Sequence, residues 1–238
     1  MMTIGVLLCG YLALLKAKSI GINNEEMIVV MAVALGMALL SAGLLYILVT
    51  YPIKELINSI LNKNFTFLKN GGLVFYGGLV GGIIGSIFAL RWQHLDASKV
   101  EQCLIPVLPL GHAIGRVGCL FAGCCHGFEY TGPLAVNNLL VSTGKTYFPI
   151  QAVEALLNLG IFIFFLWYTR KKRPPYHILC AYLLFYSILR FILEFYRGDL
   201  IRGSFLILST SQWISIVVFL VSIFGFYISK EQKSNKIK

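Results

Sequence analysis

Long uninterrupted apolar stretches are the feature that most limits what this chain can fold into. The clearest of them spans residues 27–51 and ends at Pro52. About 20 apolar residues in a helix match the hydrocarbon thickness of a bilayer. Charged residues make up only 13% of the chain, whereas soluble domains carry about 25%. The sequence therefore predicts an all-α integral membrane protein and excludes a water-soluble domain.

The apolar segments predict seven transmembrane helices in a single transmembrane domain that covers residues 1–238. A short outer loop is expected at about 128–148, and a basic cytoplasmic tail at 230–238. Residues 54–70 carry an apolar stripe that is typical of an amphipathic helix at the membrane interface. The seven spans are expected at residues 3–15, 27–51, 71–90, about 103–127, 149–169, 176–196 and 210–229.

Basic residues set the predicted orientation. The densest cluster, Arg-Lys-Lys-Arg at 170–173, lies between the fifth and sixth spans. Cytoplasmic loops are enriched in Lys and Arg, so the N-terminus is expected outside and the C-terminus inside. The formal net charge of +10 is then a consequence of topology, and no nucleic-acid partner is expected.

A few polar residues lie inside the apolar segments. A charge at the bilayer centre costs about 2.5–3.5 kcal/mol and usually has a partner or a function. Tyr186, Arg190 and Glu194 recur every four residues and share one helix face. This stripe is either a structural ion pair or the lining of a cavity for a polar substrate, and a separate arginine favours the cavity. The whole set is Tyr76, His112, Arg116, Gln151, Glu154, Tyr186, Arg190 and Glu194.

Glycine-rich segments predict close helix packing and a central cavity. Gly77, Gly81 and Gly85 have the spacing that lets two helix backbones approach each other; contact with a lipid tail is the alternative. Glycines between Gly111 and Gly127 argue against a regular lipid-facing helix, because irregular backbone at depth must be buried in protein or line a wet cavity. We expect arginines in this cavity to bind a phosphate, which guanidinium groups match bidentately.

Cys119, Cys124, Cys125 and His126 form a compact group in the sequence. Small, tightly packed residues without chemistry are the leading interpretation. A disulfide or a reactive thiol on the outer side is an alternative, and a metal site is a weaker one. Because adjacent cysteines suit one tetrahedral site poorly, we predict neither a metal nor a cofactor.

Four blocks, in order, resemble the bacterial prolipoprotein diacylglyceryl transferases. Residues 75–81 are similar to the family's Phe-His-Gly-Gly-Leu-Ile-Gly, and 115–127 to its signature Gly-Arg-x-Gly-Asn-Phe-x-Asn-x-Glu-x-x-Gly. Residues 148–154 resemble His-Pro-Ser-Gln-Leu-Tyr-Glu, and 186–197 resemble Tyr-x-x-x-Arg-Phe-x-x-Glu-Phe-x-Arg. Residues 211–215 are similar to the Gly-Gln-Trp-Leu-Ser that opens the family's last span.

The resemblance implies a transferase of the bacterial cell membrane with a role in lipoprotein biosynthesis. Such an enzyme moves diacylglyceryl from phosphatidylglycerol to a cysteine thiol of a lipoprotein precursor. The implied partners are phosphatidylglycerol or another anionic phospholipid, and a thiol-bearing protein or peptide. Two alternatives stay open: the same donor with a different acceptor, and an inactive protein that binds an anionic lipid.

The resemblance also implies roles for the matching residues. The family's histidine is Tyr76 here, and the signature's asparagines and glutamate are Cys119, Ala122 and Cys124. The implied catalytic residues are Arg116, Tyr186, Arg190 and Tyr76. The implied substrate-binding residues are Gly77, Gly78, Gly115, Gly127, Gln151, Glu154, Glu194 and Arg197.

Overall fold

The computed structural model describes residues 1–62, 72, 74–137, 144–198, 204–205 and 208–235. The chain divides into two compact units, and each is described by itself. One comprises Met1–Ile20 with Ala97–Lys238, and the other comprises Gly21–Asp96. The expectation of a single transmembrane domain stays a prediction.

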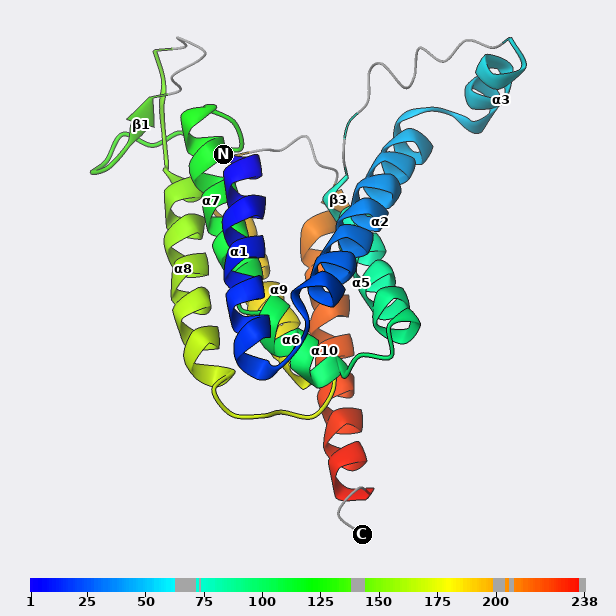
Figure 1. Cartoon of the computed structure of the whole chain (residues 1–238). Coiled ribbons are helices and arrows are strands. Elements are labelled where there is room, and N and C mark those ends of the chain that lie inside the picture. Colours follow the sequence, from blue (N-terminus) through cyan, green and yellow to red (C-terminus); the bar gives the residue numbers. More distant parts are fainter. Residues whose placement is uncertain (63–71, 73, 138–143, 199–203, 206–207, 236–238) are drawn as a thin grey trace. The chain divides into compact units, whose positions relative to one another are not determined.

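The first unit consists of helices that pack in neighbouring pairs (Figure 1). Helix α7 contacts both α1 and α8, and α9 packs along α10. Two short antiparallel strand pairs, β1–β2 and β3–β4, precede α8 and α10. The elements are α1 (Met2–Ile20), α6 (Ala97–Leu104), α7 (Val107–Phe121), β1 (Val136–Asn137), β2 (Thr146–Tyr147), α8 (Ile150–Tyr168), α9 (His177–Glu194), β3 (Ser204–Phe205), β4 (Leu208–Ser209) and α10 (Thr210–Asn235).

The second unit contains α2 (Asn24–Thr50), α3 (Ile53–Leu61) and α5 (Phe75–Trp92). Helices α2 and α5 pack closely because α5 presents glycines to α2. A Cβ atom on Gly77 would lie 2.5 Å from the carbonyl oxygen of Ser41, and the Ser41 hydroxyl donates to the Gly77 carbonyl at 2.5 Å. Cβ atoms on Gly81 and Gly85 would also meet α2. The helix-packing interpretation of these glycines is confirmed.

Six of the described helices are long and apolar enough to cross a membrane. They are Met2–Ile20, Asn24–Thr50, Ala97–Phe121, Ile150–Tyr168, His177–Glu194 and Thr210–Ser229. The seventh predicted span corresponds to α5, whose apolar part, Tyr76–Trp92, is shorter. The fold is therefore that of an all-α, multi-pass membrane protein; the seventh crossing and the orientation stay predictions.

The expectation of irregular backbone from Gly111 onward is wrong for its first part. The helical span starts earlier, at Ala97, and α7 is regular as far as Phe121. Intrahelical hydrogen bonds are needed in lipid, and this requirement outweighs the roughly 1 kcal/mol by which glycine disfavours a helix. Gly111 also admits α1, since a Cβ there would lie 3.2 Å from the sulfur of Cys9.

The remaining expectations about connecting segments are met in part. The predicted interfacial helix begins as α3, and residues 63–71 lie outside the described part of the chain. Helix α10 continues past the last candidate span to Asn235, and the basic cytoplasmic tail at 230–238 stays a prediction. Residues 236–238 and 138–143 also lie outside the description.

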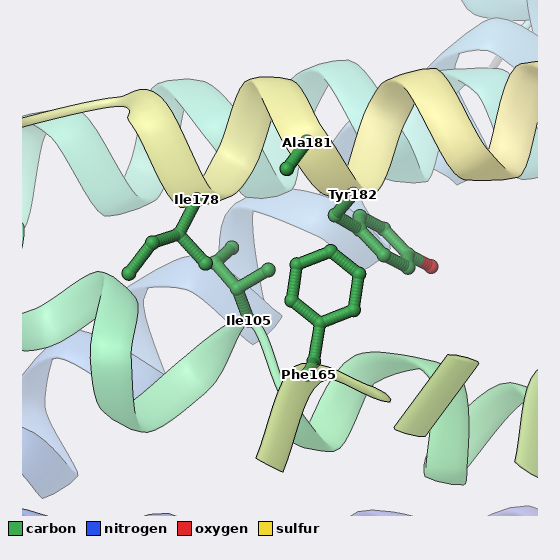
Figure 2. Close-up of a cluster of buried hydrophobic side chains, with 5 residues drawn as sticks. All are labelled: Ile105, Phe165, Ile178, Ala181 and Tyr182. Carbon is green, nitrogen blue, oxygen red and sulfur yellow. The ribbon is translucent and has the colours of Figure 1, made fainter. Parts of the chain in front are cut away.

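A buried apolar cluster joins α8 and α9 to the link between α6 and α7 (Figure 2). Phe165 is fully buried, and Tyr182 lies against it from α9 with ring centroids 6.2 Å apart. Tyr182 precedes Tyr186 by one helical turn. The cluster therefore fixes the part of α9 from which its polar stripe begins. Its members are Ile105, Phe165, Ile178, Ala181 and Tyr182.

The α2–α5 contact gives the first test. Gly77→Ala would push a methyl group into the backbone of α2, and such overpacking costs about 1–3 kcal/mol. Gly43→Ala is the matched control, because nothing lies within 4 Å of its Cβ position. Thermal unfolding in detergent should show a lower midpoint for Gly77→Ala alone. Equal midpoints for both variants would contradict the packing.

Candidate active site

A buried ion pair joins α7 to α8. The Arg116 Nε lies 2.9 Å from the Glu154 Oε1, and the side chain of Glu154 is only 2% exposed. His112, one turn before Arg116 on α7, places its Nε2 3.6 Å from the same oxygen. A single carboxylate thus lies beside two basic groups of the facing helix, and it offsets a charge that would otherwise be unpaired.

A second buried ion pair lies within α9. The Arg190 Nη2 is 2.7 Å from the Glu194 Oε2, and both side chains are 8% exposed. Helix α10 and the strand before it hold this pair. Arg190 donates to the Ser211 hydroxyl at 3.3 Å, and the Ser209 hydroxyl donates to the Glu194 Oε1 at 3.0 Å. The polar stripe on α9 therefore contains an ion pair that other elements position.

Two aromatic side chains connect the ion pairs. The ring of His112 lies against that of Tyr186, with centroids 5.4 Å apart, and Tyr186 precedes Arg190 by one turn. His112 is also within electrostatic range of both guanidinium groups. The two arginines therefore belong to one polar network in the interior of the first unit.

Arg190 and Gln151 each keep a buried polar atom that makes neither a hydrogen bond nor an ion pair to any described group. The Arg190 Nη1 and the Gln151 Oε1 are buried and make no hydrogen bond to any described group. The Gln151 amide is oriented by its other end, because its Nε2 donates to the Cys124 carbonyl at 2.8 Å. Buried polar groups are nearly always satisfied, so a free donor and a free acceptor are features of a site that takes a polar ligand.

Backbone segments meet tightly beyond the end of α7. Gly127 pairs with Arg197 in an isolated antiparallel bridge, and the Gly127 amide donates to the Phe148 carbonyl at 3.1 Å. A Cβ atom on Gly127 would lie 2.8 Å from the Phe148 oxygen and 2.9 Å from the Tyr196 oxygen. Gly127 is thus required for the close approach that places Arg197 beside the cysteine turn.

That turn carries a perturbed thiol. A hydrogen bond from Cys119 stabilises the thiolate of Cys125 and lowers its pKa well below the usual range. The charge of Arg197 and its hydrogen bond lower this pKa further, and the charge of Arg116 adds to them. Thiolates are the reactive and metal-binding form of cysteine.

Four further predicted site residues lie on α5 and α7. Tyr76, Gly77 and Gly78 lie on α5 in the second unit, where Gly77 and Gly78 face α2. Nothing lies within 4 Å of a Cβ built on Gly115, so this glycine is not needed for helix packing. The roles predicted for these four residues stay predictions.

Sequence reasoning did not assign His112, Ser209 or Ser211 to the site. His112 belongs to the polar set at depth and lies four residues before Arg116, which was the available signal. Ser211 belongs to the block at 211–215 near the start of α10, and Ser209 lies just before α10 in β4. Their contacts with Arg190 and Glu194 depend on tertiary packing, which spacing within one helix does not specify.

The fold and the network define a class of protein: a multi-pass helical membrane protein with two buried arginine–glutamate ion pairs in its interior. The family model described as "Prolipoprotein diacylglyceryl transferase" matches residues 1–228. The chain therefore belongs to the prolipoprotein diacylglyceryl transferase family, as the resemblance predicted.

Relatives of this family match along nearly the whole chain. A phosphatidylglycerol–prolipoprotein diacylglyceryl transferase of Clostridium tetani is 31% identical over 98% of this chain and 92% of its own length. Transferase 2 of Clostridium perfringens is 29% identical over 97% of this chain and 89% of its own. The phosphatidylglycerol–prolipoprotein diacylglyceryl transferase of Clostridioides difficile is 28% identical over 99% of this chain and 91% of its own length.

The buried carboxylate of Glu154 gives the second test. Glu154→Ala leaves Arg116 buried without its partner, and this should lower the free energy of unfolding by about 3–5 kcal/mol. The loss is measured as the free energy of unfolding in mixed micelles. The double variant Arg116→Ala/Glu154→Ala should lose less than the sum of the two single variants, because partners in one ion pair are coupled.

Glu129→Ala is the control for this experiment. It also removes a carboxylate from an ion pair, with Lys145, but both side chains are more than half exposed. Exposed ion pairs contribute little, so this variant should unfold like the wild type. Similar losses for Glu129→Ala and Glu154→Ala, or strict additivity in the double variant, would contradict a structural role for the Arg116–Glu154 pair.

Proposed function

We propose that this protein transfers the diacylglyceryl group of phosphatidylglycerol to a cysteine thiol of a lipoprotein precursor. The relatives carry this activity in their names and match the chain along nearly its full length. The observation that carries the proposal is the buried Nη1 of Arg190, which has no hydrogen-bond partner among the described residues. Such a donor suits a phosphate oxygen that enters from the membrane.

Arg116 and Arg190 are the proposed phosphate ligands. Each uses one guanidinium nitrogen in an ion pair with a glutamate, which leaves other nitrogens of the same fork for a ligand. Charge-assisted hydrogen bonds to phosphate are among the strongest available in proteins. They strengthen as negative charge develops on the departing glycerol phosphate, and this differential stabilisation is what accelerates the transfer.

Gln151 is the proposed ligand for the donor's polar headgroup. Its Oε1 is buried and free among the described groups, so it accepts a hydrogen bond from a glycerol hydroxyl. Glu154 and Glu194 hold the two arginines in place, and Arg197 and Gly127 form the rim of the site. Tyr186, which lies against His112, is a proposed proton carrier for the acceptor thiol, together with Tyr76.

The predicted topology and location complete the proposal. The protein lies in the bacterial cell membrane with its N-terminus outside and its C-terminus inside. The turn at Gly127 and the segment that begins at Arg197 then lie toward the outer side, where a lipoprotein precursor presents its cysteine. We expect the predicted central cavity to lie between the arginines and to open to the lipid phase, where it admits the donor.

The test is a transfer assay with purified protein. The protein is incubated with acyl-labelled phosphatidylglycerol and a peptide that carries a lipoprotein-precursor cysteine, and the product is identified by mass spectrometry. Arg116→Ala and Arg190→Lys should each lose about 100-fold or more in rate, since a lost oxyanion-type donor has this effect. Arg190→Lys keeps the charge and loses the bidentate geometry.

Arg170→Ala is the matched control, because this arginine is exposed in the loop after α8 and should transfer lipid like the wild type. Wild-type rates in both site variants would contradict the proposal. If the label appears on a molecule other than the peptide, that molecule is the acceptor and the proposed acceptor is wrong. If lipid binds but no glycerol phosphate is released, the protein is an inactive lipid-binding protein.

A further inference from the structure

Three cysteine sulfurs converge at the C-terminal end of α7. The sulfurs of Cys119, Cys124 and Cys125 all lie within 4.8 Å of one another, and together they form a group of potential metal ligands. All three cysteines are free of disulfides. His126 is not a member of this group; its ring lies against Tyr147 and its Nδ1 is 3.0 Å from the Gly127 carbonyl.

The backbone conformation of the turn allows adjacent Cys124 and Cys125 to belong to one cluster. Gly123 and Cys125 both adopt the left-handed conformation, with φ of 63° and 60°. For a residue with a side chain this conformation costs about 1–2 kcal/mol. This left-handed turn brings the sulfurs of both Cys124 and Cys125 close to that of Cys119. In a regular helix or strand, the side chains of two consecutive residues point in different directions.

The donor set suits zinc. Thiolate sulfur is a preferred ligand of Zn²⁺, which is bound tetrahedrally with zinc–sulfur distances of about 2.3 Å, so ligand sulfurs lie about 3.8 Å apart. The three sulfurs, which all lie within 4.8 Å of one another, would move to about this separation when they bind zinc. Three protein ligands leave the fourth position open, and an open position distinguishes catalytic from structural zinc sites.

The surroundings balance the charge of such a site. Three thiolates and one Zn²⁺ carry one net negative charge, and the guanidinium groups of Arg197 and Arg116 lie nearby. Gln151, which donates to the Cys124 carbonyl, lies one turn from Glu154 on α8. The cluster is therefore adjacent to the proposed phosphate site rather than in a separate region.

We propose that Cys119, Cys124 and Cys125 bind one Zn²⁺ ion, whose open position takes the acceptor thiol. The second part of this proposal rests on the proposed function. Metal coordination deprotonates a thiol, so zinc would activate the acceptor, a role for which this chain has Tyr76 in place of the family's histidine.

The reaction balances without a redox step. The acceptor thiol binds zinc and gives its proton to a neighbouring base or water. Its sulfur then forms a bond to the glyceryl carbon of the donor, and the bond from that carbon to the phosphate oxygen breaks. Glycerol phosphate leaves as an anion, the product thioether leaves zinc, and the oxidation state of the metal does not change.

Metal analysis of the purified full-length protein tests the site. The wild type should contain about one zinc per chain, with a sulfur shell at about 2.3 Å in X-ray absorption. Cys119→Ser and Cys125→Ser should lose this zinc. Cys9→Ser is the matched control, since Cys9 lies on α1 and its sulfur contacts the Val107 carbonyl, so it should retain the metal.

Removing zinc from the wild-type protein with a chelator tests the role of the metal even if the cysteine variants fail to fold. Removing zinc should lower the transfer rate about 100-fold or more, in the range of other proton-transfer catalysis, and added Zn²⁺ should restore it. Active wild type without zinc, or zinc retained by both site variants, would overturn this inference and leave the proposed function intact. Zinc bound in the wild type without any lipid transfer would instead contradict the proposed function.

Discussion

Charge compensation inside an apolar bundle is the constraint on which this structure depends. Two arginines lie among membrane-spanning helices, and each has a glutamate within 2.9 Å. Without these carboxylates the guanidinium groups would be buried charges in a medium that solvates them poorly. The pairing accounts for the presence of Glu154 and Glu194, and it explains how strongly polar groups persist between α7, α8 and α9.

Small residues let the helices and backbone segments of this bundle pack closely. Glycines on α5 admit the backbone of α2, and Gly127 admits two neighbouring backbone segments beyond the end of α7. In a bilayer the hydrophobic effect does not drive helices together, so backbone proximity and interhelical hydrogen bonds take its place. Substitution of these glycines therefore affects assembly before it affects chemistry.

Much of the fold could be predicted from the sequence because the bilayer imposes simple rules. Apolar length located the helices, and spacing of four placed Tyr186, Arg190 and Glu194 on one face. The regularity of α7 was missed, because glycine content says less about backbone in lipid than in water. The partnership of Arg116 with Glu154 and the clustering of adjacent Cys124 and Cys125 could not be predicted, because both depend on contacts or dihedral angles that no helical period encodes.

The central claim is that Arg116 and Arg190 bind one phosphate together. A structure of the protein in nanodiscs that contain phosphatidylglycerol tests it most directly. The account predicts phosphate oxygens within about 3 Å of a guanidinium nitrogen of each arginine, with the Arg190 Nη1 among them. A headgroup bound away from both arginines, each still satisfied by its glutamate alone, would contradict it.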